Sequence, residues 1–89
     1  MKFDFLIVGS GLFGSTFARL ATDNGKRCLV IEKRPHIGGN VYCKTVEGIN
    51  VHQYGPHIFH TSDKLVWEFV KRFVTFNHFT LMTVANYKG

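Results

Sequence analysis

An apolar run that leads directly into a glycine-rich turn is the strongest constraint on this chain. Residues 3–8 read F-D-F-L-I-V, and Gly9-x-Gly11-x-x-Gly14 follows at once. A short apolar run bounded by glycine is typical of a buried strand. From 12 to 23, apolar residues then recur at the spacing of one helical face, which predicts a helix.

A second strand completes the unit. Asn24-Gly25 ends the predicted helix, with Gly25 suited to the left-handed position after a helix. Residues 27–32 (R-C-L-V-I-E) predict another buried strand. Strand, tight turn, helix and strand within about 30 residues indicate a right-handed parallel βαβ unit. The predicted class is therefore α/β, the N-terminal βαβ part of a Rossmann-like domain with an incomplete parallel sheet.

The rest of the chain is less regular. Short strands are predicted at 41–43 and 49–52, around a turn at 47–48, and 54–60 is a second loop. Thr61 or Ser62 is the predicted helix cap, Leu65, Val66, Phe69, Val70 and Phe73 the buried face of that helix, and 76–87 an extended segment. A doubly wound domain needs more parallel strands than these two. Residues 1–89 are therefore predicted to be one partial domain of a larger protein, the alternative being a complete small α+β domain.

Composition excludes several classes of protein. The formal charge of +5 comes from 11 Lys and Arg against 6 Asp and Glu, and the basic residues are scattered. We therefore expect a phosphate-bearing small ligand and no nucleic acid. No apolar run approaches the roughly 20 residues of a membrane span, so no membrane partner is expected. The two cysteines, Cys28 and Cys43, lack zinc spacing and are expected to be reduced thiols in a cytoplasmic protein.

The glycine turn has the context of a dinucleotide site. It follows a predicted strand, opens a predicted helix, and has Glu32 at the end of the next strand. Gly11 would leave room for a pyrophosphate, and Gly14 would let helix and strand pack closely. The Glu32 carboxylate can accept hydrogen bonds from ribose hydroxyls and would repel a 2′-phosphate, so NADP is disfavoured.

A second glycine pair, Gly38-Gly39, follows the second strand in the block Glu32-Lys33-Arg34-x-x-Ile37-Gly38-Gly39-Asn40. Many FAD proteins have such a pair beside the cofactor phosphates, whereas a plain NAD dehydrogenase does not need one. Lys33 and Arg34 add positive charge, and Asn40 can hydrogen bond near a flavin. The alternative is a simple surface turn.

The histidine-rich block, residues 52–61, has two interpretations. His57-x-x-His60 suggests a metal site, but no Cys or carboxylate completes one and Pro56 excludes helical ligand spacing, so no metal is expected. We expect instead that the loop lines a flavin face, where an imidazole can place positive charge beside a reduced flavin. His36 and His52 are expected only to brace their loops.

Three blocks together resemble the UDP-galactopyranose mutase family: I-V-G-S-G-L-F-G, V-I-E-K-R-x-x-I-G-G-N and H-x-Y-G-x-H-I-F-H-T. The first two are shared in looser form by amine oxidases and desaturases, and the third is the specific one. The resemblance implies an isomerase that interconverts UDP-galactopyranose and UDP-galactofuranose with reduced FAD. Its substrate would be UDP-galactose, and the protein is expected to be a homo-oligomer.

The resemblance also implies residue roles. The implied cofactor-binding residues are Gly9, Gly11, Leu12, Phe13, Gly14, Glu32, Lys33, Arg34, Gly39, Asn40, His57 and Ile58, and His60 is the residue expected closest to the chemistry. Leu81 stands where the family often has a polar Asn, which puts substrate contacts from 79–83 in doubt.

Taken alone, the 89 residues are expected to be inactive, to bind FAD weakly or not at all, and to self-associate through an exposed strand edge. Two alternatives stay open: the N-terminal segment of another FAD-dependent oxidoreductase, and a non-catalytic nucleotide-binding module.

Overall fold

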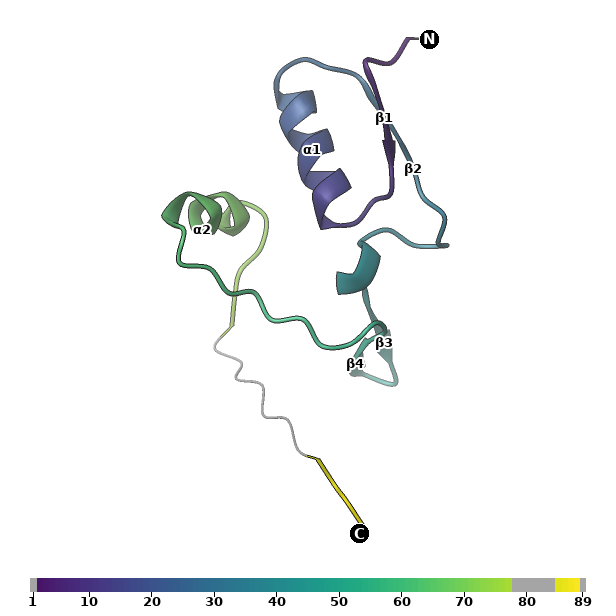
Figure 1. Cartoon of the computed structure of the whole chain (residues 1–89), viewed down its shortest axis with the longest axis vertical. Coiled ribbons are helices and arrows are strands. Elements are labelled where there is room, and N and C mark those ends of the chain that lie inside the picture. The colour runs from purple at the N-terminus through teal and green to yellow at the C-terminus, as the bar shows by residue number, and fades with distance from the viewer. Residues whose placement is uncertain (1, 78–84, 89) are drawn as a thin grey trace. The chain divides into compact units, whose positions relative to one another are not determined.

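The computed structural model describes residues 2–77 and 85–88, and these divide into two compact units with the boundary between His57 and Ile58. The first unit contains, in chain order, β1 (Phe5–Val8), α1 (Leu12–Asp23), β2 (Cys28–Ile31), a 3₁₀ turn (Gly39–Val41), β3 (Cys43–Val46) and β4 (Ile49–His52) (Figure 1). The described helix of the second unit is α2 (Lys64–Lys71).

The first unit is built on a parallel strand pair. β1 and β2 run in register from Phe5 opposite Cys28 to Val8 opposite Ile31, and α1 connects them beside the pair (Figure 1). The Gly9 N–H donates to the Ile31 carbonyl at 2.8 Å, which extends the ladder into the glycine turn. This arrangement confirms the predicted α/β class and the βαβ unit.

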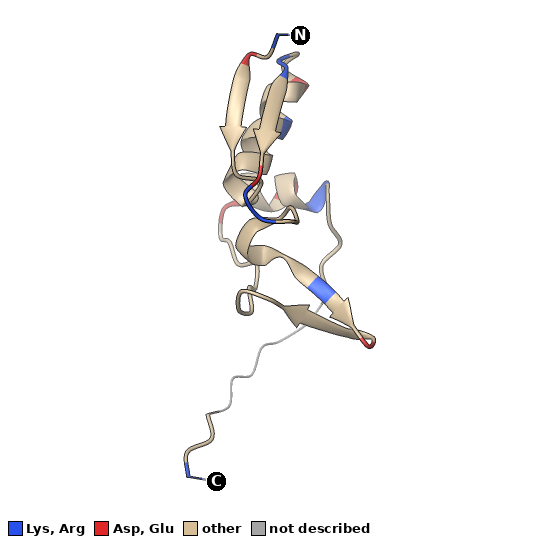
Figure 2. Ribbon diagram, turned by 90° about the vertical axis from the view of Figure 1, so that its right-hand side faces the viewer, with Lys and Arg blue, Asp and Glu red and all other residues tan. Residues whose placement is uncertain are grey.

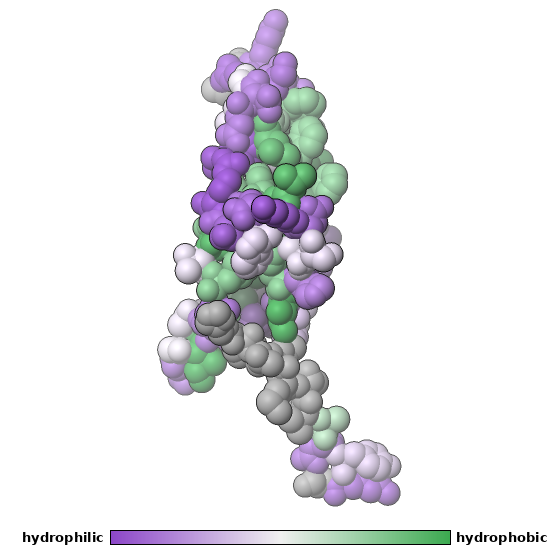
Figure 3. Space-filling model, turned by 90° about the vertical axis from the view of Figure 1, so that its left-hand side faces the viewer, coloured by the Kyte–Doolittle hydropathy of each residue, from purple (hydrophilic) through white to green (hydrophobic). Residues whose placement is uncertain are grey.

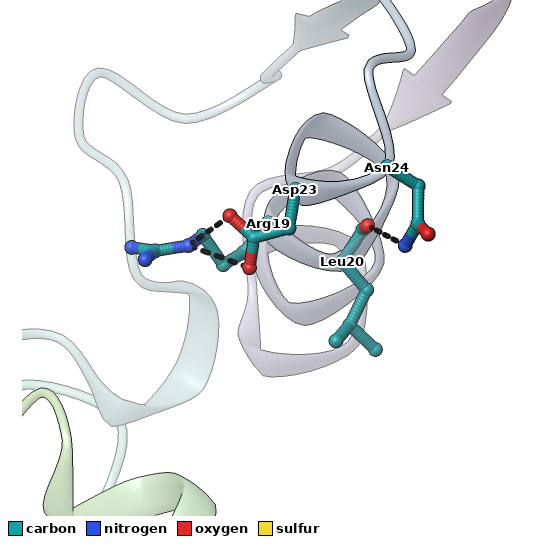
Figure 4. Close-up of polar contacts among 4 residues, drawn as sticks. All are labelled: Arg19, Leu20, Asp23 and Asn24. Atoms are coloured by element: carbon teal, nitrogen blue, oxygen red, sulfur yellow. Dashed lines mark hydrogen bonds and ion pairs between the residues drawn. The ribbon is translucent and has the colours of Figure 1, made fainter.

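The end of α1 follows the sequence signals closely. The Asn24 side chain donates to the Leu20 carbonyl at 2.8 Å, and Arg19 Nε pairs with Asp23 Oδ1 at 3.0 Å one turn apart (Figure 4). Gly25 has φ of 76°, the left-handed conformation that ends a helix at low steric cost. The helix therefore stops where the predicted glycine is.

Little of this unit is buried. Among the described residues, the buried ones are Ile7, 8% exposed, and Ser10, 5% exposed. The prediction of two buried strands was wrong for this chain: Leu6 and Val8 are 63% and 78% exposed, and Figure 3 shows apolar atoms at the surface. A pair of strands with one helix beside it offers cover for one face only, so alternate side chains face solvent.

The hairpin β3–β4 turns at Glu47 and Gly48, with φ of 51° and 78°. Positive φ at both central residues is the conformation that matches strand twist in two-residue hairpins. The start predicted for the strand at 41–43 was wrong, because Val41 ends a 3₁₀ turn and β3 begins at Cys43. The positive φ of Gly38 and Gly39, 101° and 61°, curls the chain there instead of extending it.

In the second unit, α2 begins after Asp63. The Asp63 carboxylate accepts from the backbone N–H groups of Leu65 at 2.9 Å and Val66 at 3.4 Å. The predicted caps were therefore wrong, and Thr61 supports the true cap because its hydroxyl accepts from the Asp63 N–H at 3.0 Å. A carboxylate at this position also suits the positive end of the helix.

The apolar face predicted for α2 is not buried, since Leu65 is 81% exposed. The described part of this unit contains no second helix or strand that could cover it. Trp67, which is not part of the predicted face, stacks on Phe76 at 5.1 Å and on Phe59 at 6.0 Å between ring centroids. Residues 78–84 of the predicted extended segment, Leu81 included, lie outside the described residues.

Lys and Arg residues in the first unit are spread over α1, the loops around β2 and the hairpin (Figure 2). In the part of the chain that the structure describes, no helix is long and apolar enough to cross a membrane.

Candidate functional site

The glycine turn after β1 is tight because Gly9 adopts a left-handed backbone conformation and Gly14 leaves no room for a side chain. Gly9 has φ of 101°, a conformation that L side chains rarely adopt. A Cβ on Gly14 would overlap the carbonyl oxygen of Gly9 and lie 3.2 Å from Ile7 Cγ2. The first turn of α1 can therefore lie directly against the end of β1.

The second glycine pair contacts the first glycine turn. The Gly38 N–H donates to the Ser10 carbonyl at 2.9 Å. A Cβ on Gly39 would come within 2.8 Å of Gly11 Cα, whereas a Cβ on Gly11 would meet only Gly39 Cα, at 3.7 Å. Two loops distant in sequence thus form one surface of main chain, with open space beside Gly11.

Glu32 connects the end of β2 to the same turn. Its Oε1 accepts from the Ser10 N–H at 2.8 Å and from the Ser10 hydroxyl at 2.7 Å, and its Oε2 accepts from the Arg34 N–H at 2.8 Å. The hydrogen bond from the Arg34 backbone, followed by those from Ser10, lowers the pKa of the Glu32 carboxyl to about 2. The carboxylate is therefore ionised at neutral pH and lies beside the glycine turn, as the dinucleotide interpretation requires.

These elements enclose an open groove of about 780 Å³. Ten of the predicted cofactor-binding residues line it: Gly9, Gly11, Leu12, Phe13, Gly14, Glu32, Arg34, Gly39, Asn40 and His57. Lys33 is not among the lining residues, and Ile58 and His60 belong to the second unit. We call this groove the glycine cradle.

The cradle has the chemistry of an anion site. α1 has no side-chain cap and no acidic residue in its first turn, and residues 12–14 of that turn line the cradle, so the positive end of the helix lies beside it. A side chain at position 11 would occupy the open space beside Gly11, so the glycine leaves that space to a ligand. Glu32 Oε2 accepts from the Arg34 N–H, and a carboxylate oxygen can accept a further hydrogen bond from a ribose hydroxyl. The residues present therefore fit the diphosphate and ribose of a dinucleotide.

A cluster of rings and a guanidinium braces the rim of the cradle. Arg34 donates to Asn40 Oδ1 at 3.0 Å, and its guanidinium lies 4.0 Å from the centre of the Tyr54 ring. His36 stacks on Tyr42 with centroids 3.8 Å apart, and its Nε2 lies 2.7 Å from the Tyr54 hydroxyl. The loop after β2 is thus held in place by side chains from both ends of the hairpin.

Sequence reasoning missed Ser10, Tyr42 and Tyr54. Ser10 occupies a variable position of the glycine motif, and its burial was the missing signal. Tyr42 and Tyr54 act through contacts with His36, 6 and 18 positions earlier, which no local pattern reports.

The histidine-rich block does not form a metal centre in the described residues. His57 Nδ1 lies 2.8 Å from the Gly55 carbonyl, and His52 Nδ1 lies 3.3 Å from Cys43 Sγ. Within residues 2–77 and 85–88, no three His, Cys, Asp or Glu side chains gather where they could hold a metal ion.

Comparison with known proteins agrees with this geometry. The chain is 50% identical over 86 residues to the dTDP-fucopyranose mutase of Escherichia coli, which covers 94% of this chain and 23% of that protein. It is 46% identical over 80 residues to the UDP-galactopyranose mutase of Mycoplasma genitalium and 42% identical over 80 residues to that of Mycoplasma pneumoniae, in each case 88% of this chain and 20% of the relative. The chain thus spans about a fifth of the length of the curated relatives it matches.

The family model described as an NAD(P)-binding Rossmann-like domain matches residues 7–73, which include the end of β1, the glycine turn, α1, β2, the second glycine pair and α2. This match covers most of the chain, and the parallel βαβ unit with its glycine turn is the structure that such a domain requires. The chain belongs to the NAD(P)-binding Rossmann-like domain family.

Proposed function

We propose that this chain binds the ADP portion of FAD, as the N-terminal part of a flavin-dependent nucleotide-sugar mutase. The observation that carries the proposal is the contact of the two glycine loops, with Gly39 against Gly11 and the Glu32 carboxylate beside them. A plain NAD site does not need the second glycine pair, whereas many FAD proteins have one. The similarity to sugar mutases over most of the chain supports the same conclusion.

The roles proposed for individual residues follow from their positions in the cradle. Main-chain N–H groups at residues 11–14 would bind the diphosphate, and the free capacity of Glu32 Oε2 would bind a ribose hydroxyl. Arg34 is held at the rim by Asn40 and Tyr54, where its charge favours an anionic ligand.

The flavin side would be formed by further residues of the two loops. Asn40 and His57 line the cradle and would lie toward the flavin ring. Lys33, Ile58 and His60 are proposed from the resemblance alone: Lys33 beside the adenosine ribose, Ile58 at the ring, and His60 nearest the reacting atoms.

A bound, reduced flavin would supply nucleophilic chemistry toward the anomeric carbon of the nucleotide sugar. The contribution of this chain is to hold the cofactor, to orient it through Glu32 and the glycine loops, and to exclude side chains from the diphosphate path. The proposed substrate is UDP-galactose. dTDP-fucopyranose is the second candidate, because the relative of that name is 50% identical to this chain.

Cofactor binding can be tested directly by ¹⁵N–¹H NMR titration of the chain with ADP, FAD and NAD. We expect weak binding, with a Kd of about 1 mM or above, because most of the cofactor would lie outside the cradle. Shifts should concentrate at Gly11, Gly14, Ser10 and Glu32. Gly11→Ala should abolish them while the spectrum stays folded, since the added Cβ meets only Gly39 Cα at an ordinary distance. A clear preference for NAD over FAD would overturn the flavin assignment.

Mutase activity can be tested with a chimera in which this chain replaces the matching 86 residues of the Escherichia coli dTDP-fucopyranose mutase. We expect the chimera to bind FAD and to interconvert the sugar isomers only after the flavin is reduced. Activity with oxidant consumption would favour the oxidoreductase alternative. A folded chimera without FAD would refute the role proposed for the cradle.

A further inference from the structure

One face of the hairpin β3–β4 carries a row of polar side chains outside the glycine cradle. Cys43 lies opposite His52 in the antiparallel register, and Thr45 lies opposite Asn50 two residues further along. Residues two apart on a strand share a face, so these four side chains lie together. The Thr45 hydroxyl and Asn50 Oδ1 are 3.4 Å apart, which agrees with this placement.

Within this row, Cys43 and His52 form a thiol–imidazole pair. Cys43 Sγ lies 3.3 Å from His52 Nδ1, and both residues are exposed. The same sulfur lies 3.7 Å from the Val41 carbonyl oxygen. The thiol has one proton, and the imidazole nitrogen is both the nearer acceptor and the stronger base. The pair therefore has the two parts of an activated nucleophile: a sulfur that solvent reaches and a base within hydrogen-bond distance.

We propose that Cys43 is a site of reversible mixed-disulfide formation with low-molecular-weight disulfides of the oxidised glutathione class, with His52 as the base. The Cys43 proton passes to His52 Nδ1, and the thiolate attacks one sulfur of the small disulfide. A bond forms between Cys43 Sγ and that sulfur, and the original S–S bond breaks. The leaving thiolate takes a proton and departs as the reduced thiol, so Cys43 is oxidised and the small disulfide is reduced.

The polar row favours a ligand of this class. Thr45 and Asn50 offer uncharged donors and acceptors beside the thiol, where the carboxylate and amide groups of a bound tripeptide would lie. Lys44 follows Cys43 in sequence and pairs with Val51 on the opposite face of the hairpin. The site requires no nucleotide, so this proposal can be tested independently of the proposed cofactor binding.

The second cysteine provides an internal reference. Cys28 lies in β2, is half-buried, and its thiol has no imidazole partner among the described residues. The chain is incubated with excess oxidised glutathione at pH 7, and the adduct at each cysteine is followed by peptide mass spectrometry. We expect Cys43 to react at least about tenfold faster than Cys28. Reduction with dithiothreitol should release the adduct.

Two variants separate the imidazole from general effects of charge. His52→Gln should slow the reaction of Cys43 about tenfold, whereas Lys44→Gln, which removes an adjacent positive charge, should slow it less than twofold. Circular dichroism of each variant verifies that the fold is kept. In 6 M guanidinium chloride, where both cysteines lose their neighbours, the two rates should become nearly equal.

Several outcomes would overturn the proposal. Equal rates at Cys43 and Cys28 in the folded chain would show that the thiol is not activated. If Lys44→Gln and His52→Gln slow the reaction of Cys43 equally, nearby positive charge and not the imidazole base determines its rate. If Cys43 still reacts faster than Cys28 in guanidinium chloride, the difference in rate comes from the local sequence and not from the folded hairpin.

Discussion

Gly14→Ala should destabilise the first unit strongly, because the added methyl group has nowhere to go. It would overlap the Gly9 carbonyl oxygen and lie 3.2 Å from both Gly9 C and Ile7 Cγ2. A Cβ has no rotamer that avoids main-chain atoms, so α1 must move away from β1. Overpacking of this kind costs about 3 kcal/mol, and the better helix propensity of alanine offsets about 1 kcal/mol. The net loss of about 2 kcal/mol lowers the ratio of folded to unfolded chain about 30-fold.

The loss can be measured by urea denaturation of the chain, followed by circular dichroism at 222 nm. Thr16→Ala is the matched control, since it introduces alanine at an exposed position of the same helix. We expect this control to be as stable as the parent chain or slightly more stable. If Gly14→Ala unfolds at the same urea concentration as Thr16→Ala, the close approach of α1 to β1 is not what the glycine provides.

Three further changes test other parts of the chain. Glu32 has a folded pKa of about 2 against an ordinary 4.5, so the stability it contributes is complete above pH 4.5 and lost as the pH falls toward 2; Glu32→Gln should remove this part of the pH dependence of unfolding. Asp63→Ala should cost about 1 kcal/mol of α2 stability and lower the helical signal, whereas Ser62→Ala should not. Tyr54→Phe removes the hydroxyl 2.7 Å from His36 Nε2 and should cost about 1 kcal/mol, with changed imidazole NMR shifts; unchanged shifts would show that this contact does not order the ring. Sedimentation at rising concentration should show self-association of the chain, because its apolar strand faces are exposed, and a strictly monomeric profile would contradict this.

The local architecture was predictable because its signals are local. The bounds of α1 agree with its apolar period, and Gly25 adopts the conformation that ends it. The turn at Glu47 and Gly48 was predicted for the same reason. Asp63 was harder, since Thr61, Ser62 and Asp63 are all competent caps and only the geometry selects one.

Burial was not predictable from the same signals. An apolar run indicates what a strand would bury if covered, but whether it is covered depends on segments packed against it. Leu6 and Leu65 have the right character and are exposed.

In the candidate site, too, one residue could be predicted from a sequence motif and its partner could not. Glu32 was predicted beside the glycine turn because motif and spacing require it, and the structure brings them together. Its partner Ser10 was missed, because a serine at a variable motif position carries no signal in sequence.

The meeting of Gly11 with Gly39 has a consequence for how this protein can vary. Peptide groups from two loops form the base of the glycine cradle, so the hydrogen-bonding groups there belong to the backbone and hardly depend on which residues are present. A substitution at either glycine can block this main-chain surface but cannot change which hydrogen bonds it offers. A change in the ligand that such a domain binds must therefore come from the side chains that line the cradle, such as Arg34, Asn40 and His57, and not from its main-chain base.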